Sequence, residues 1–137
     1  MKLRALALAI FTLGVLFPCS NLAFAGDEVS IEGQERINIQ QAMKRFIDEG
    51  TVDGVYRHYD PVTGKILRLE FIDLKSKVLK KGGFYVSCGN FKDHRGRPVD
   101  LDLLVIHDGD YMRGTQAAVH KLPGDKERRS RIYQPAD

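Results

Sequence analysis

The fold is decided by the stretch FYVSCGNFKDHRGRPVDLDLLVI, which spans residues 84–106. It contains two runs rich in β-branched and aromatic residues, 84–91 and 99–106, on either side of a polar loop with a glycine at position 96. Runs of this kind, bounded by turn residues, are typical of β-strands. We therefore expect two antiparallel strands joined by the loop of residues 92–98.

The register of this pair follows if Phe91 lies opposite Val99 at the loop. Two cross-strand pairs then share one face of the sheet, and they are Cys88 with Asp102 and Asn90 with Asp100. Apolar residues continue the same face further from the loop, namely Phe84, Val86, Leu104 and Ile106. A slip of one residue would turn these side chains away, because side chains alternate along a strand. In a curved sheet, this half-polar and half-apolar face could form a pocket.

Further strands are expected on both sides of this pair. Residues 65–72 alternate apolar and charged side chains, which predicts a half-buried strand. Residues 55–59 form a shorter run before the turn at 60–64. After the central pair, Asp108-Gly109 marks a hairpin turn that leads into a last long strand, 111–121. Residues 131–133 could add a short edge strand.

One amphipathic helix precedes these strands. Its apolar residues recur at spacings of three and four, which places them on one face: Ile39, Ala42, Met43, Phe46 and Ile47. Asn38 is suited to cap its start and Gly50 to end it, so we expect a helix over residues 39–49 after a loose lead-in. The chain is thus predicted to be α+β, with one N-terminal helix packed on an antiparallel β-meander of about five strands.

The segments at 60–65, 83–88 and 99–103 resemble those of small exported bacterial proteins with no assigned activity. The layout over residues 55–121 is similar to the cystatin-like or nuclear-transport-factor-like roll. This resemblance implies a curved sheet that wraps a helix, and it carries over no catalytic residues. Rolls of this kind host both enzymes and binding modules.

The N-terminus has the parts of a secretory signal peptide: a basic start at residues 1–4, a charge-free run at 5–17, and small residues at 23 and 25. We expect a signal peptide over residues 1–25, cut between Ala25 and Gly26. The mature single domain, 26–137, would then be periplasmic or secreted by a bacterium. It contains no second hydrophobic stretch, so it is not expected to span a membrane. An uncleaved anchor or a lipoprotein cut before Cys19 is less favoured.

Loss of this segment would leave a nearly neutral chain with one cysteine. The formal net charge falls from +3 to +1 when Lys2 and Arg4 leave, which argues against nucleic acid as a partner. Four lysines between positions 75 and 81 form a basic cluster that we expect on solvated strand ends. Cys88 cannot form an internal disulfide, and a role as a small buried apolar residue is favoured over a nucleophile or metal ligand.

His120 joins the face of the two aspartates only if the hairpin turn carries one extra residue. The histidine then meets Asp100 and Asp102, and such an acid–histidine cluster suits metal binding or proton transfer. With a tight two-residue turn, Arg113 and Lys121 take its place and form ordinary cross-strand ion pairs. The ion pair is the favoured alternative.

The candidate ligand-binding residues are therefore Cys88, Asn90, Asp100, Asp102 and His120. A non-enzymatic exported binding module for a small ligand or an envelope protein is favoured, with no cofactor and no assigned metal ligand. Two alternatives stay open. One is a small metal-binding protein or enzyme centred on the Asp and His residues. The other is a homodimer formed through the sheet face that a single helix leaves uncovered.

Overall fold

The structure is a computed structural model that describes residues 29–126 of the chain. The predicted signal peptide, its cleavage point between Ala25 and Gly26, and the possible edge strand at 131–133 lie outside this range. Within it, no helical segment combines the length and the hydropathy needed to cross a bilayer.

The described chain forms one helix and one eight-stranded antiparallel sheet. The helix is α1 (Gly33–Glu49), and the strands are β1 (Val29–Ile31), β2 (Thr51–Val52), β3 (Val55–Asp60), β4 (Lys65–Leu74), β5 (Val78–Lys81), β6 (Phe84–Asp93), β7 (Pro98–Asp108) and β8 (Tyr111–Lys121). The α+β class is confirmed. The expected count of about five strands is wrong, because β1, β2 and β5 are too short to show a periodic pattern.

The helix begins six residues earlier than its apolar stripe predicts. Glu32, and not Asn38, occupies the N-cap position, and its side chain makes no capping hydrogen bond. The first turn is instead tied to the sheet, since the Tyr85 hydroxyl donates to the Glu35 carboxylate over 2.7 Å. A tertiary contact of this kind leaves no signal in local sequence. The predicted end at Gly50 is confirmed.

Strand β6 is the centre of the sheet. It pairs with β7 along almost its whole length on one side, and its other side is shared by β5 and β4. The sheet continues with β8 beyond β7, with β3 and β2 beyond β4, and with β1 beyond β5. The expected simple meander is therefore interrupted, because the consecutive strands β4 and β5 lie end to end along the same neighbour.

A kink between β4 and β5 makes this arrangement possible. The Lys75 amide donates to the Cys88 carbonyl over 2.9 Å, and the Gln40 side chain of α1 donates to the Lys75 carbonyl over 3.0 Å. The buried Ser87 hydroxyl reaches the carbonyls of Lys75 (3.3 Å) and Lys77 (2.7 Å). These bonds fix the end of β4 and hold Lys75 beside the candidate site.

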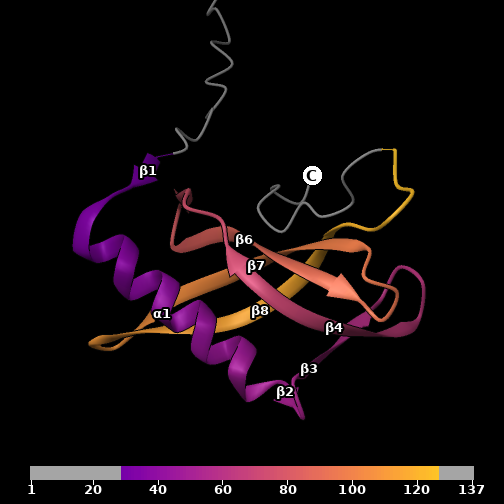
Figure 1. Cartoon of the computed structure of the whole chain (residues 1–137). Helices are drawn as coiled ribbons and strands as arrows, with labels where there is room; N and C mark the ends of the chain where they lie inside the picture. The colour runs from indigo at the N-terminus through magenta and orange to yellow at the C-terminus, as the bar shows by residue number, and fades with distance from the viewer. Residues whose placement is uncertain (1–28, 127–137) are drawn as a thin grey trace, which may run out of the picture.

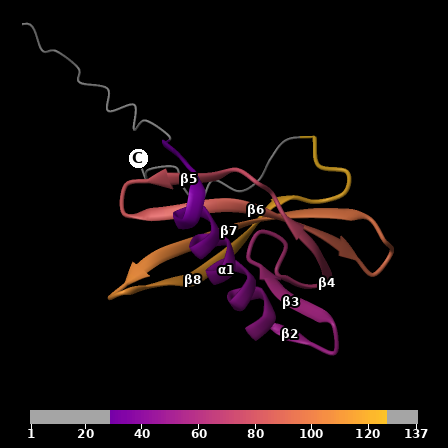
Figure 2. The ribbon, with the colours of Figure 1, turned by 60° about the vertical axis from the view of Figure 1, so that its left-hand side comes forward.

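Helix α1 runs obliquely across one face of the curved sheet (Figures 1 and 2) and packs mainly on β8 and β7. The predicted stripe is confirmed, with Phe46 half-buried and the other members buried: Ile39, Ala42, Met43 and Ile47. Alternate residues of β7 complete the core beneath it: Val99, Leu101, Leu103 and Val105. The helix lies close to the backbone of β8 at Gly114, where an added Cβ would lie 2.5 Å from the Phe46 Cβ.

Candidate functional site

The register predicted for β6 and β7 is confirmed. Cys88 lies opposite Asp102, Asn90 lies opposite Asp100, and Phe91 lies opposite Val99, although the ladder continues for one more pair at residues 92 and 98 before the loop. Because side chains alternate along a strand, these four residues lie on the sheet face opposite the one that α1 covers. The polar half of that face is the candidate site.

His120 reaches this face through a bulge in β8 that the sequence does not reveal. The turn is tight, since Asp108 pairs directly with Tyr111. The extra residue lies within β8 instead: the register shifts between Leu104 and Val105 and leaves Thr115 without a partner on β7. A bulge turns the following side chains to the other face. A second shift, between residues 100 and 101, leaves His120 itself as the extra residue.

The ion pairs expected from a tight turn are therefore largely wrong. Arg113 binds Asp108, with its Nε 2.6 Å from a carboxylate oxygen, and lies near the far end of the hairpin. Lys121 does lie opposite Asp100. However, the ion pair of Asp100 in the described chain is made by Lys75, whose Nζ lies 3.3 Å from the carboxylate.

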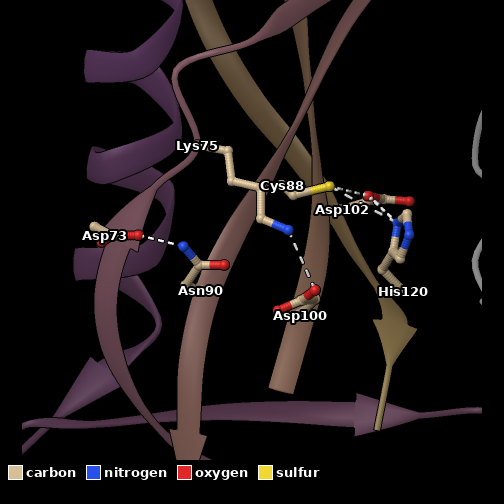
Figure 3. A network of polar contacts seen from close by, with 7 residues as sticks. All are labelled: Asp73, Lys75, Cys88, Asn90, Asp100, Asp102 and His120. Carbon is tan, nitrogen blue, oxygen red and sulfur yellow. Dashed lines mark hydrogen bonds and ion pairs between the residues drawn. The ribbon is translucent and has the colours of Figure 1, made fainter. Parts of the chain in front are cut away.

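Cys88, Asp102 and His120 form a compact cluster on three adjacent strands (Figure 3). One carboxylate oxygen, Oδ1 of Asp102, lies 2.9 Å from the Cys88 Sγ and 2.7 Å from the His120 Nδ1. The Sγ and the Nδ1 are themselves 3.8 Å apart. Thus the thiol, the imidazole and the carboxylate each place one atom that can bind a metal ion within 3.8 Å of the other two.

The cluster is held away from solvent. Asp102 is 1% exposed, His120 is 3% exposed, and Cys88 is half-buried. Burial, together with the hydrogen bond to the Asp102 carboxylate and its negative charge, raises the pKa of the Cys88 thiol to about 12, although the Lys75 ammonium opposes this rise. The thiol is therefore protonated at neutral pH. Its surroundings are polar, unlike the apolar strand interior expected from the sequence.

Two further polar contacts border the cluster. The Asn90 amide donates a hydrogen bond to Asp73 of β4, and Lys75 reaches across β6 to Asp100 (Figure 3). Asn90 and Asp100 thus stand near the cluster without joining it. Asp73 was not among the residues expected at the site, and Lys75 was expected on solvated strand ends. The β4–β6 ladder brings Asp73 opposite Asn90, through a register shift between Phe71 and Asp73, and the kink after β4 brings Lys75 beside Cys88. Neither a register shift nor a kink of this kind carries a compositional signal.

The geometry of the cluster distinguishes a catalytic Cys–His–Asp triad from a metal-binding site. A nucleophilic Cys–His–Asp triad uses both ring nitrogens, with one toward the acid and the other toward the nucleophile. Here Cys88 and Asp102 both meet the Nδ1 of His120, so the ring does not relay a proton between them. A raised thiol pKa is also the wrong direction for a nucleophile. Convergence of three donor atoms is the arrangement that a metal ion requires.

Comparison with family models, with curated proteins and with solved structures finds no match to this chain. The chemical interpretation of the cluster therefore rests on its own atoms: the three donor types, their separations, and their burial.

Proposed function

We propose that this protein is exported and binds a transition-metal ion, with Zn²⁺ as the best fit, through Cys88, Asp102 and His120. One observation carries the proposal: the three donor atoms lie within 4.8 Å of one another and come from three neighbouring strands. The proposal takes up an alternative that the sequence left open, a small metal-binding protein centred on the Asp and His residues, although no metal ligand was assigned from the sequence. It keeps the expectation of a non-enzymatic binding protein.

The donor set favours zinc over harder cations. A thiolate and an imidazole suit Zn²⁺ or copper, whereas Mg²⁺ and Ca²⁺ prefer oxygen ligands alone. Zinc bonds to sulfur at about 2.3 Å and to nitrogen and oxygen at about 2.0–2.2 Å. Replacing the two hydrogen bonds to Asp102 by metal bonds requires the donor atoms to separate by roughly half an ångström. Three protein ligands would leave a fourth tetrahedral position for water or a partner group.

Metal binding at this cluster must displace the Cys88 proton. It also requires the His120 Nδ1, which now donates to the Asp102 carboxylate, to carry no proton, so that the proton of the neutral ring lies on Nε2. The pKa of the thiol lies near 12, so the protein at neutral pH offers a thiol where the metal needs a thiolate. The apparent affinity should therefore rise about tenfold per pH unit through the neutral range, as one proton is released for each ion bound.

The test is a titration of the metal-free protein with Co²⁺, which follows Zn²⁺ in its choice of ligands. Coordination by Cys88 would produce thiolate-to-cobalt charge-transfer absorption in the near ultraviolet, and Zn²⁺ should abolish that absorption by competition. Cys88→Ser and Asp102→Asn should each lower the Zn²⁺ affinity by more than about 100-fold, because even supporting residues change metal affinity by 10- to 100-fold.

The matched control is Asp100→Asn, which makes the same chemical change two residues along β7, at a carboxylate bound to Lys75. It should keep the charge-transfer band and leave the Zn²⁺ affinity within about threefold, as expected outside the ligand set and its supporting residues. Circular dichroism of each variant separates loss of a ligand from loss of the fold. A Zn²⁺ affinity that is the same in Cys88→Ser and in the unaltered protein overturns the proposal.

Export is tested with the same protein purified from its own envelope fraction. Native mass spectrometry should give the mass of residues 26–137, as cleavage between Ala25 and Gly26 requires, together with one metal adduct. A mass that includes residues 1–25 contradicts the export part of the proposal and leaves the metal part to the titration.

A further inference from the structure

A second candidate binding site lies where β4 and β6 separate, away from the cluster of Cys88, Asp102 and His120. A pocket of about 440 Å³ opens between the β3–β4 hairpin and the β6–β7 turn. This volume is within the roughly 300–1,000 Å³ range of small-molecule sites. None of its lining residues belongs to the cluster of Cys88, Asp102 and His120.

The pocket exists because two strands part. β4 pairs with β6 only from Leu69 onward, where Leu69 lies opposite Asp93 at the end of β6. Residues 65–68 of β4 pair with β3, so within the described sheet their other edge faces the β6–β7 turn across the pocket. Leu122 and Pro123, which follow β8, close one side.

The floor of the pocket is apolar. Leu69 and Val99 are buried members of the core, and Leu67 and Leu122 are half-buried and pack against it. An alkyl chain placed here would remove the exposed parts of Leu67 and Leu122 from water. Burial of apolar surface of this kind is favourable in proportion to its area.

The rim of the pocket is cationic. Lys65, Arg68 and Arg95 line it, and none of the three forms an ion pair with a carboxylate within residues 29–126. The one acidic lining residue, Asp93, is already neutralised by Arg97, whose Nη2 lies 2.7 Å from its carboxylate. The rim therefore carries an excess of positive charge.

The same aspartate fixes the shape of the rim. Its other oxygen accepts the amides of Arg95 and Arg97, each over 2.9 Å, and the turn is completed by Gly96, whose φ of 73° suits glycine. Burial alone would raise the pKa of Asp93. The hydrogen bonds from Arg97 and Arg95 outweigh it and lower the pKa to about 2. Arg95 is thus held at the rim by a turn whose anchoring carboxylate, Asp93, is ionised at neutral pH.

From this floor and rim we infer that the pocket binds an amphipathic monoanion, with an alkyl chain on Leu67 and Leu122 and a carboxylate head between Arg68 and Arg95. A purely polar anion would leave the apolar floor unused, and an uncharged chain would leave the cations unused. Planar guanidinium groups bind carboxylates through two parallel hydrogen bonds, which favours arginine as the contact for the head.

Decanoate is a suitable probe, with acetate as its head alone and decanol as its chain alone, all kept below the concentrations at which they aggregate. We expect decanoate to bind at least tenfold more tightly than either fragment. In nuclear magnetic resonance spectra, the shifted amide signals should cluster at residues 65–69 and 95–97. Equal binding of decanoate and decanol, or shifts confined to other strands, overturns the inference.

The double variant Arg68→Gln, Arg95→Gln should lower the decanoate affinity about tenfold and leave decanol binding unchanged. The matched control is Arg57→Gln, since Arg57 is exposed and lies opposite Arg68 across the β3–β4 pair but does not line the pocket. An equal loss in the control would mean that general surface charge attracts the anion, which also overturns the inference. Metal binding should be unaffected in both variants, so this result is independent of the proposed function.

Discussion

Cys88 has the surroundings of a thiol that is held in its protonated form. Its S–H donates to the buried Asp102 carboxylate over 2.9 Å, and burial together with this neighbour raises the pKa from an ordinary value of 9.0 to about 12. Between these two pH values the folded protein binds more protons than the unfolded chain. The free energy of unfolding should therefore fall as the pH rises through this window.

The measurement is urea denaturation at pH 7.5 and pH 10 for the unaltered protein and for Cys88→Ala. The pKa of Tyr85 is also raised by burial and by Glu35, to about 12, so both proteins should lose some stability at high pH. The unaltered protein should lose more, because only it carries the thiol. An equal loss in both proteins would contradict the assignment of a strongly raised thiol pKa.

At the scale of single residues, the sequence predicts contacts within one hairpin, and it does not reveal contacts that depend on a shift in strand register. Cys88 and Asp102 could be paired in advance, because the two-residue period of a strand and a recognisable loop determine their register. His120 could not be placed, because the residue that turns it toward Asp102 is inserted at Thr115 and not in the turn. No residue type marks that insertion.

Among the elements, β8 is the strand on which the site depends, and its contact with α1 is unusually close. Gly114 directly precedes the bulge at Thr115 and lies under the helix. An added Cβ at this position would be 2.5 Å from the Phe46 Cβ and 3.2 Å from the Ala42 carbonyl oxygen. Neither atom is the far end of a flexible side chain, so the helix or the strand would have to move.

Gly114→Ala should therefore destabilise the protein by about 1–3 kcal/mol, the usual cost of overpacking a core contact. Gly83→Ala is the matched control, since a Cβ at Gly83 meets nothing within 4 Å and its backbone is not in the left-handed region. Chemical denaturation measures both. A Gly114→Ala variant as stable as Gly83→Ala would show that α1 does not rest on β8 at this point.

Among the helices and strands, the long periodic elements could be predicted from the sequence and the short ones could not. The long strands and the apolar stripe of α1 were predictable, because each repeats a pattern over many residues. The short strands β1, β2 and β5 were not, since two to four residues carry no period. The first turn of α1 was missed because it is polar and is anchored by Tyr85 from a distant strand.

At the scale of the whole molecule, the proposed metal ion would cross-link the three central strands of the sheet. Its ligands lie on β6, β7 and β8, and they are separated by 14 and 18 residues along the chain. An unfolded chain does not hold such a set together, so the ion would bind the folded state far more tightly. Cys88 is the one free cysteine of the described residues, and a metal could supply the kind of cross-link that a disulfide supplies in many small secreted domains. Whether the chain also forms a homodimer or meets an envelope partner stays a prediction.

Thermal unfolding tests this role. A ligand present at 100 times its dissociation constant stabilises the folded state by about 2.7 kcal/mol. For a domain of this size, that corresponds to a rise in Tm on the order of 10 °C. We expect this rise with Zn²⁺ and none with Mg²⁺, because a thiol and an imidazole are poor ligands for a hard cation. Cys88→Ser should unfold at the same temperature with and without zinc. If Zn²⁺ raised the Tm of Cys88→Ser as much as that of the unaltered protein, the ion would be binding at another site. The three central strands would then be held together by their packing alone.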